Sequence, residues 1–124
     1  HIARKKEIFE TYKEGFRDLP LTMNPFDEET MKPNYWLSCI LIDEGCKATP
    51  EDIRLKLEKC NAESRPIWKP MHMQPVYKDC DYITATENEN VGEDIFARGL
   101  CLPSDITMTK EEQTTIIDII RSCF

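Results

Sequence analysis

Three prolines, Pro66, Pro70 and Pro75, constrain the middle of this chain more than any other feature of the sequence. Proline fixes the backbone angle φ and has no amide hydrogen. It also restricts the residue before it to extended conformations. The segment from Ser64 to Lys78 is therefore predicted to be a stiff, extended connection, with the regular elements of the fold on either side of it.

Four segments are predicted to be helices. In residues 2–18 the apolar side chains recur at helical spacing. Thr49 and Thr109 have the sequence context of helix N-caps, and Gly99, typical of a left-handed helix end, closes a helix over residues 91–98. The residues predicted to face the core are Ile8, Phe9, Tyr12, Phe16 and Leu19 in the first helix, Ile53, Leu57 and Cys60 in the second, and Gln113, Ile116, Ile117 and Ile120 in the last.

The predicted strands are shorter. Residues 34–43 are aromatic and β-branched, which favours a strand. Residues 65–67 fit a short edge strand, because Pro66 cannot donate to a neighbour. Residues 100–102 form a third strand, and residues 20–33 and 84–90 are predicted to be irregular loops. The alternation of helices and strands predicts an α+β domain in which helices pack on a small sheet.

The chain length and the net charge exclude several classes of protein. The chain has 124 residues, which corresponds to a single domain over residues 1–124. Its net charge of −7 argues against nucleic acid as a partner, since nucleic-acid binding depends on clustered positive charge. No apolar run approaches the roughly 20 residues that cross a bilayer, so no membrane segment is expected.

The six cysteines, Cys39, Cys46, Cys60, Cys80, Cys101 and Cys123, include no Cys-x-x-Cys pair. Several have apolar neighbours, where a free thiol behaves as a small hydrophobic side chain. We therefore expect reduced, buried cysteines and a cytoplasmic protein. The sequence has two histidines, one of them at position 1, so no metal site is expected.

The segment from Ser64 to Lys78 also differs from the rest of the chain in chemistry. It contains three cations and no acid, with Trp68, His72, Gln74 and Tyr77 interspersed. A rigid loop with cations and rings suits an anionic ligand that has a planar part, such as a nucleotide diphosphate. The alternative is a plain connecting loop, in which the aromatic side chains are core anchors and the cations are solvated.

Residues 64–77, Ser-Arg-Pro-Ile-Trp-Lys-Pro-Met-His-Met-Gln-Pro-Val-Tyr, resemble the signature loop of the small C-terminal domain in the DegT/DnrJ/EryC1/StrS family of sugar aminotransferases. These are pyridoxal-phosphate (PLP) enzymes of the aspartate aminotransferase fold (fold type I), so the resemblance implies a small, mostly antiparallel sheet with helices packed on it. Arg65–His72 is similar to the branch that aminates UDP-4-keto-6-deoxy-N-acetylhexosamines. Residues 4–12, 34–42, 91–104 and 108–120 resemble other elements of the same domain, in the expected order.

The resemblance implies that the chain is the C-terminal fragment of a longer enzyme, and a first helix without a capping residue before it is consistent with this. Nothing in the sequence matches the family's motifs for the lysine that holds PLP covalently or for the carboxylate facing its ring nitrogen. Both lie in the family's large N-terminal domain. The chain alone is therefore expected to be inactive and to bind no PLP, with the large domain and a second subunit of a homodimer as its partners.

The implied activity of the parent is transfer of an amino group, from glutamate, to C4 of a UDP-linked keto sugar in surface polysaccharide or glycan biosynthesis. The implied substrate-binding residues are Arg65 and Lys69 for anionic or hydroxyl groups, Trp68 for packing, and His72 for a hydrogen bond, with Asn34 and Tyr35 at the mouth of the first strand. Two alternatives stay open: a non-enzymatic regulatory module that binds a sugar nucleotide, and a purely structural domain.

Overall fold

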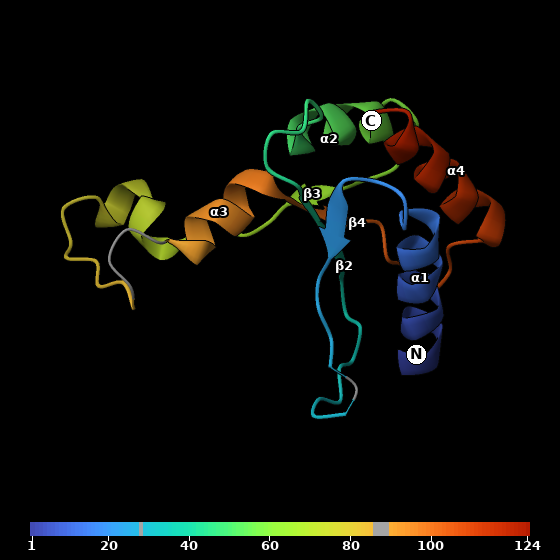
Figure 1. The fold of residues 1–124 in the computed structure, drawn as a ribbon, viewed down its shortest axis with the longest axis horizontal. Helices are drawn as coiled ribbons and strands as arrows, with labels where there is room; N and C mark the ends of the chain where they lie inside the picture. The colour runs from blue at the N-terminus through green and yellow to red at the C-terminus, as the bar shows by residue number, and fades with distance from the viewer. Residues whose placement is uncertain (28, 86–89) are drawn as a thin grey trace.

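Two paired strands at the centre of the sheet form one side of the hydrophobic core (Figure 1). The computed structural model describes residues 1–27, 29–85 and 90–124. In β2 (Ser38–Ile42) alternate side chains are buried, and Ile40 lies directly opposite Leu100 of β4 (Gly99–Leu102). Because directly opposed residues in an antiparallel pair point to the same face, the inward side chains of both strands line one side of the sheet.

Four antiparallel strands make up the sheet of the described residues, in the order β1–β2–β4–β3. The inner strands β2 and β4 share the longest pairing, whereas both edges are short. The edge strands are β1 (Leu21–Met23) and β3 (Arg65–Pro66). The prediction of a short edge strand at Pro66 is confirmed, as is that of an α+β fold with a mostly antiparallel sheet.

Three helices cover the same face of the sheet (Figure 1). They are α1 (Ile2–Gly15), α2 (Pro50–Glu58) and α4 (Lys110–Arg121). Both predicted N-caps are present: the Thr49 and Thr109 side chains each accept a hydrogen bond from the backbone N–H three residues on, and that residue's carboxylate accepts one from the backbone N–H of the cap. The core cluster consists of Ile8, Tyr12, Phe16, Ile40, Ile42, Ile53, Leu57, Leu100, Leu102, Met108, Ile116 and Ile120.

The fourth helix, α3 (Val91–Arg98), does not belong to this layer. With the two 3₁₀ turns η1 (Met71–Met73) and η2 (Pro75–Tyr77), it forms an arm that extends away from α1 and α4 (Figure 1). None of the residues of α3 is fully buried. Its bounds agree with the prediction. No helix in the described ranges is long and apolar enough to span a membrane.

The structure corrects three predictions of secondary structure. Residues 21–23, predicted to be loop, form β1, because they pair with β2. The first residues of the predicted strand over 34–43 are not extended, since Tyr35 has a positive φ of 52°. Gly99 is not a left-handed helix end: its φ of −97° and ψ of 152° are extended, and α3 runs directly into β4 there. Residues 86–89 of the predicted loop over 84–90 lie outside the described residues.

The cysteines are less buried than predicted. All six are free thiols, and Cys101 is buried. Cys39, Cys46 and Cys123 are half-buried, whereas Cys60 and Cys80 are exposed. Cys60 therefore does not line the core as predicted. It lies beyond Glu58, the last residue of α2, so the helical spacing that would place it on the buried face no longer applies there.

One ion pair links the segment that follows α1 to the end of α4, and it leads to a prediction about how the stability of the fold depends on pH. Both guanidinium nitrogens of Arg121 bind the Asp18 carboxylate, at 2.6 and 2.7 Å. The hydrogen bonds from Arg121 lower the pKa of Asp18 from 3.8 to about 2. A carboxyl group whose pKa is lower in the folded state stabilises the fold above its unfolded pKa, and this stabilisation disappears as the pH falls through its folded pKa.

We therefore expect Asp18→Asn to lower the thermal midpoint at neutral pH, and the difference from wild type to shrink as the pH falls from about 4 towards 2. Thermal unfolding followed by circular dichroism across this pH range measures the effect. Asp79→Asn, at an exposed aspartate outside this contact, is the matched control. A difference between wild type and Asp18→Asn that stayed constant down to pH 2 would contradict the role of the carboxylate charge.

Candidate functional site

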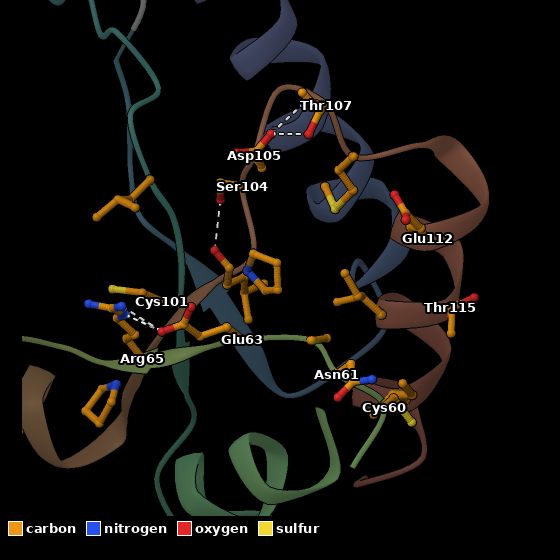
Figure 2. Close-up of a pocket in the computed structure, with 18 of the residues that line it drawn as sticks. Cys60, Asn61, Glu63, Arg65, Cys101, Ser104, Asp105, Thr107, Glu112 and Thr115 are labelled. Atoms are coloured by element: carbon orange, nitrogen blue, oxygen red, sulfur yellow. Dashed lines mark hydrogen bonds and ion pairs between the residues drawn. The ribbon is translucent and has the colours of Figure 1, made fainter. Parts of the chain in front are cut away.

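A groove of about 870 Å³ opens beside the β3 edge of the sheet (Figure 2). It exists because β3 is so short: the pairing of β3 with β4 ends at Cys101. Within the described residues, Leu102 and Pro103 therefore have no strand partner on the β3 side, although Leu102 pairs with Ser38 of β2 on the other side. Figure 2 shows Glu63, Arg65 and Cys101 on one side of the groove and Glu112 and Thr115 of α4 on the other. Apolar side chains of β4, of α4 and of the loop between them also line the groove: Leu102, Pro103, Met108, Ile116 and Ile119.

Two exposed tryptophans line the same groove. Trp36 precedes β2 and Trp68 follows β3, and their ring centroids are 6.1 Å apart at an angle of 41°. Their side chains are 63% and 65% exposed, which is unusual for so large an apolar group. An exposed aromatic pair of this kind is suited to bind a flat or apolar group. Trp68 was predicted from the sequence; Trp36 was not, although it stands in the aromatic stretch Asn-Tyr-Trp.

Acidic side chains outnumber basic ones in the lining of the groove. Arg65 is the one cation among the described lining residues, and it is paired with Glu63 at 2.7 Å. Asp105 and Glu112 are the other charged lining residues, and a hydrogen bond from the Thr107 side chain lowers the pKa of Asp105. The residues described here therefore make the groove negative on balance, which does not by itself favour a diphosphate.

The structure brings together only two of the six predicted site residues. Arg65 and Trp68 line the groove, while Lys69, His72, Asn34 and Tyr35 are not among its lining residues. Lys69 is exposed, and its backbone carbonyl accepts a hydrogen bond of 3.3 Å from the Gln74 amide.

His72 lies in the arm and connects the proline-rich segment to α3. Its Nε2 is 2.7 Å from a carboxylate oxygen of Glu93 and 3.1 Å from the side-chain nitrogen of Asn90. Its ring stacks on Tyr82 with centroids 3.6 Å apart. In this structure His72 therefore has protein partners on its ring edge and on its ring face, and it holds the arm together.

Tyr35 is a core anchor in this structure. It is 4% exposed, and its ring packs against Phe9 and Phe26 with centroids 5.5 and 5.0 Å away. Its neighbour Asn34 is exposed and accepts a hydrogen bond of 3.0 Å from the Trp36 amide. The hydrogen bond between Asn34 and the Trp36 amide and the positive φ of Tyr35 form a turn here. Because of this turn, the Tyr35 ring is buried and the Trp36 ring lies at the surface.

The groove does not have the residues needed to hold a covalently bound PLP. Such enzymes attach the cofactor through a lysine amine, and no lysine is among the described residues that line the groove. The described part of the chain also contains no group of three or more His, Cys, Asp or Glu side chains arranged to bind a metal ion.

The fold, with helices on one face of a small antiparallel sheet, matches one part of solved sugar aminotransferase structures. A solved structure of the putative sugar aminotransferase Spr1654 from Streptococcus pneumoniae, in its PLP form, superimposes on 98% of this chain with a TM-score of 0.81 and 23% identity. The chain belongs to the DegT/DnrJ/EryC1/StrS aminotransferase family, whose model matches residues 1–121. The resemblance of the proline-rich loop to this family is confirmed.

Curated relatives agree with this assignment. The chain is 32% identical over 123 residues to the putative pyridoxal phosphate-dependent aminotransferase EpsN of Bacillus subtilis (strain 168). It is 28% identical over 123 residues to a GDP-perosamine synthase of Vibrio cholerae. Each alignment covers 99% of this chain but only 31% and 32% of the relative. The chain thus spans about a third of the length of the curated relatives it matches.

Proposed function

We propose that this chain acts as the C-terminal domain of a PLP-dependent sugar-nucleotide aminotransferase. The observation that supports this most is the family match over residues 1–121, in a chain that spans 31% of its relative EpsN. The parent would transfer an amino group from glutamate to C4 of a UDP-linked keto sugar in the cytoplasm, for surface polysaccharide or glycan synthesis. PLP, which supplies the electron sink for amino transfer, would be held by the rest of the enzyme.

The contribution proposed for this domain is to bind and orient the sugar nucleotide. Trp36 and Trp68 would form an apolar wall, and Arg65 would leave Glu63 to bind a substrate oxygen. Glu63 and Arg65 are both largely exposed, so their ion pair costs little to break. Because the groove is negative on balance here, the cations that neutralise a diphosphate are proposed to come from the remainder of the parent or from Lys69.

The experiment joins this chain to its upstream reading frame and measures amino transfer from glutamate to a UDP-4-keto sugar. For Arg65→Ala in the parent we expect kcat/KM to fall by about 10- to 150-fold, the equivalent of losing one charge-assisted hydrogen bond of roughly 1.5–3 kcal/mol. Lys78→Ala is the matched control, because it removes a cation from the same segment outside the groove. Equal activity of Arg65→Ala and wild type would remove Arg65 from the mechanism.

Apolar residues exposed on the arm, and at Ile83 between η2 and α3, support the proposal that the rest of the parent and a second subunit cover this region. Ile83 is 91% exposed, Val76 77% and Val91 66%. So many large apolar side chains on one projecting element are typical of an interaction surface. We therefore propose a homodimeric parent. Sedimentation of the full-length protein tests it: a monomer at micromolar concentration would count against the dimer.

A further inference from the structure

Two cysteines that are far apart in the sequence lie side by side on neighbouring strands of the sheet. Cys39 of β2 and Cys101 of β4 are direct partners in the register of the two strands. Their sulfur atoms are 3.5 Å apart, although 62 positions separate them in the chain. Of the six cysteines, all of which lie in the described ranges, these are the two for which the structure places sulfur next to sulfur.

The backbone around Cys39 makes the pair geometrically suited to a covalent link. The Cys39 amide donates to the Asn24 side chain at 2.9 Å, and its carbonyl accepts from the Asn24 amide at 3.0 Å. Both groups point towards β1, so Cys39 and Cys101 occupy a site of the β2–β4 pair that exchanges no backbone hydrogen bonds between them. At such sites opposed Cα atoms lie about 4.5 Å apart, which is within the range that disulfides span.

Both thiols can be reached from the surface. Cys39 is half-buried, and Cys101, though buried by its own β-sheet neighbours, lines the groove. The two thiols also differ in acidity. The Cys39 thiol donates a hydrogen bond to the Cys101 sulfur, which lowers the pKa of Cys101, whereas this bond and burial raise the pKa of Cys39. Cys101 is therefore the better nucleophile of the two.

We propose that Cys39 and Cys101 form a redox-sensitive dithiol, which a hydroperoxide converts into a disulfide between β2 and β4. The Cys101 thiolate attacks one peroxide oxygen, the O–O bond breaks, and Cys101 becomes a sulfenic acid. The Cys39 sulfur then displaces hydroxide from the Cys101 sulfur and forms the S–S bond. Two thiols are oxidised and one hydroperoxide is reduced, with water and an alcohol (or a second water) as products.

The disulfide would change the wall of the groove beside Arg65. Arg65 pairs directly with Cys101, so the two side chains are on the same face of the sheet, and Figure 2 shows them on the same side of the groove. Oxidation would draw the two sulfurs together at this position and clamp the inner strands to each other. It would also remove the acidic thiol from the groove.

The test is peptide mapping of the 124-residue protein after oxidation. Reduced protein is treated with a small excess of hydrogen peroxide, free thiols are alkylated, and the denatured protein is digested with trypsin. We expect residues 99–110, which contain Cys101, to be linked to residues 18–47, which contain Cys39 and Cys46. The thermal midpoint of the oxidised monomer should rise by roughly 5–10 °C, because a cross-link restricts the unfolded chain.

Matched variants separate the candidate thiols. Cys46→Ser should keep the link, which distinguishes the two cysteines of the same peptide, and Cys60→Ser, at an exposed thiol, should leave it unchanged. Cys39→Ser should abolish it. The proposal is overturned if the link persists in Cys39→Ser, or if wild-type Cys39 and Cys101 remain alkylated while other thiols oxidise. The wild-type peptide map tests the proposal even if Cys39→Ser does not fold. Wild-type protein that is oxidised while unfolded in guanidinium should lose the preference for the Cys39–Cys101 link, because the fold no longer holds the two sulfurs together.

Discussion

Replacing Tyr12 by alanine is expected to destabilise the protein by about 3–5 kcal/mol, as truncation of a buried aromatic side chain usually does. Tyr12 is fully buried at the point where α1, α4 and the chain after β4 meet. Its ring stacks on Phe16 with centroids 5.7 Å apart, and its hydroxyl donates to the Pro103 carbonyl at 2.8 Å. The alanine variant would leave a cavity and an unpaired carbonyl in the same place.

Tyr12→Phe separates these two contributions, because it keeps the ring and removes only the hydroxyl. We expect it to cost about 1 kcal/mol, the net value of one buried hydrogen bond. Urea unfolding followed by far-ultraviolet circular dichroism measures both variants. Tryptophan fluorescence is a poor probe of the core here, since Trp36 and Trp68 are both exposed. Equal losses in Tyr12→Ala and Tyr12→Phe would show that the ring contributes no packing energy.

Gly99→Ala is expected to have the second largest effect, a loss of about 3 kcal/mol, at the upper end of the cost of overpacking. A Cβ atom at this position would lie 2.4 Å from the Ile95 carbonyl oxygen and 2.5 Å from Cγ1 of Ile67. The Ile95 oxygen is backbone of α3 and cannot rotate away. The variant must therefore separate α3 from β4 or displace Ile67, which immediately precedes Trp68, so the groove should be disturbed together with the fold.

Gly92→Ala is the matched control within the same helix. A Cβ there would have its nearest contacts at 3.6 Å, to Asn90 and Pro70, which is ordinary van der Waals contact. Alanine also favours the helix by about 1 kcal/mol relative to glycine, so this variant should be neutral or slightly stabilising. Urea midpoints of both variants, compared with wild type, decide the prediction. A Gly99→Ala protein as stable as Gly92→Ala would contradict the close approach at the α3–β4 junction.

Elements with a strong local signal could be predicted from the sequence. The caps at Thr49 and Thr109 were predicted because side chain and backbone partners lie three residues apart. The strand β1 could not be predicted: its three residues are too few to show an alternating pattern, and its partner lies well along the chain in β2. Gly99 was misassigned for a related reason. Its small size serves contact with Ile67, far away in sequence, rather than a turn of its own backbone.

The candidate site divides in the same way. Arg65 and Trp68 could be predicted as site residues, and the family could be recognised, because the residues concerned lie close together in the proline-rich loop. Trp36 becomes part of the site only through the pairing of the strands, which places its ring centroid 6.1 Å from that of Trp68. His72 and Tyr35 have ring chemistry that suits a ligand, yet each has its protein partners from other segments, Glu93 and Phe9 among them.

The sequence by itself determined the helix starts, the stiffness of the loop around Pro70 and the family, because each depends on residues that are neighbours along the chain. Only the tertiary structure decided which of those residues share a surface. The pairing of β4 with β2 on one side and with β3 on the other brings Trp36 beside Trp68, and the β2–β4 pairing brings Cys39 beside Cys101. Such contacts depend on strand register, and register is set by burial of one sheet face across distant segments rather than by local sequence.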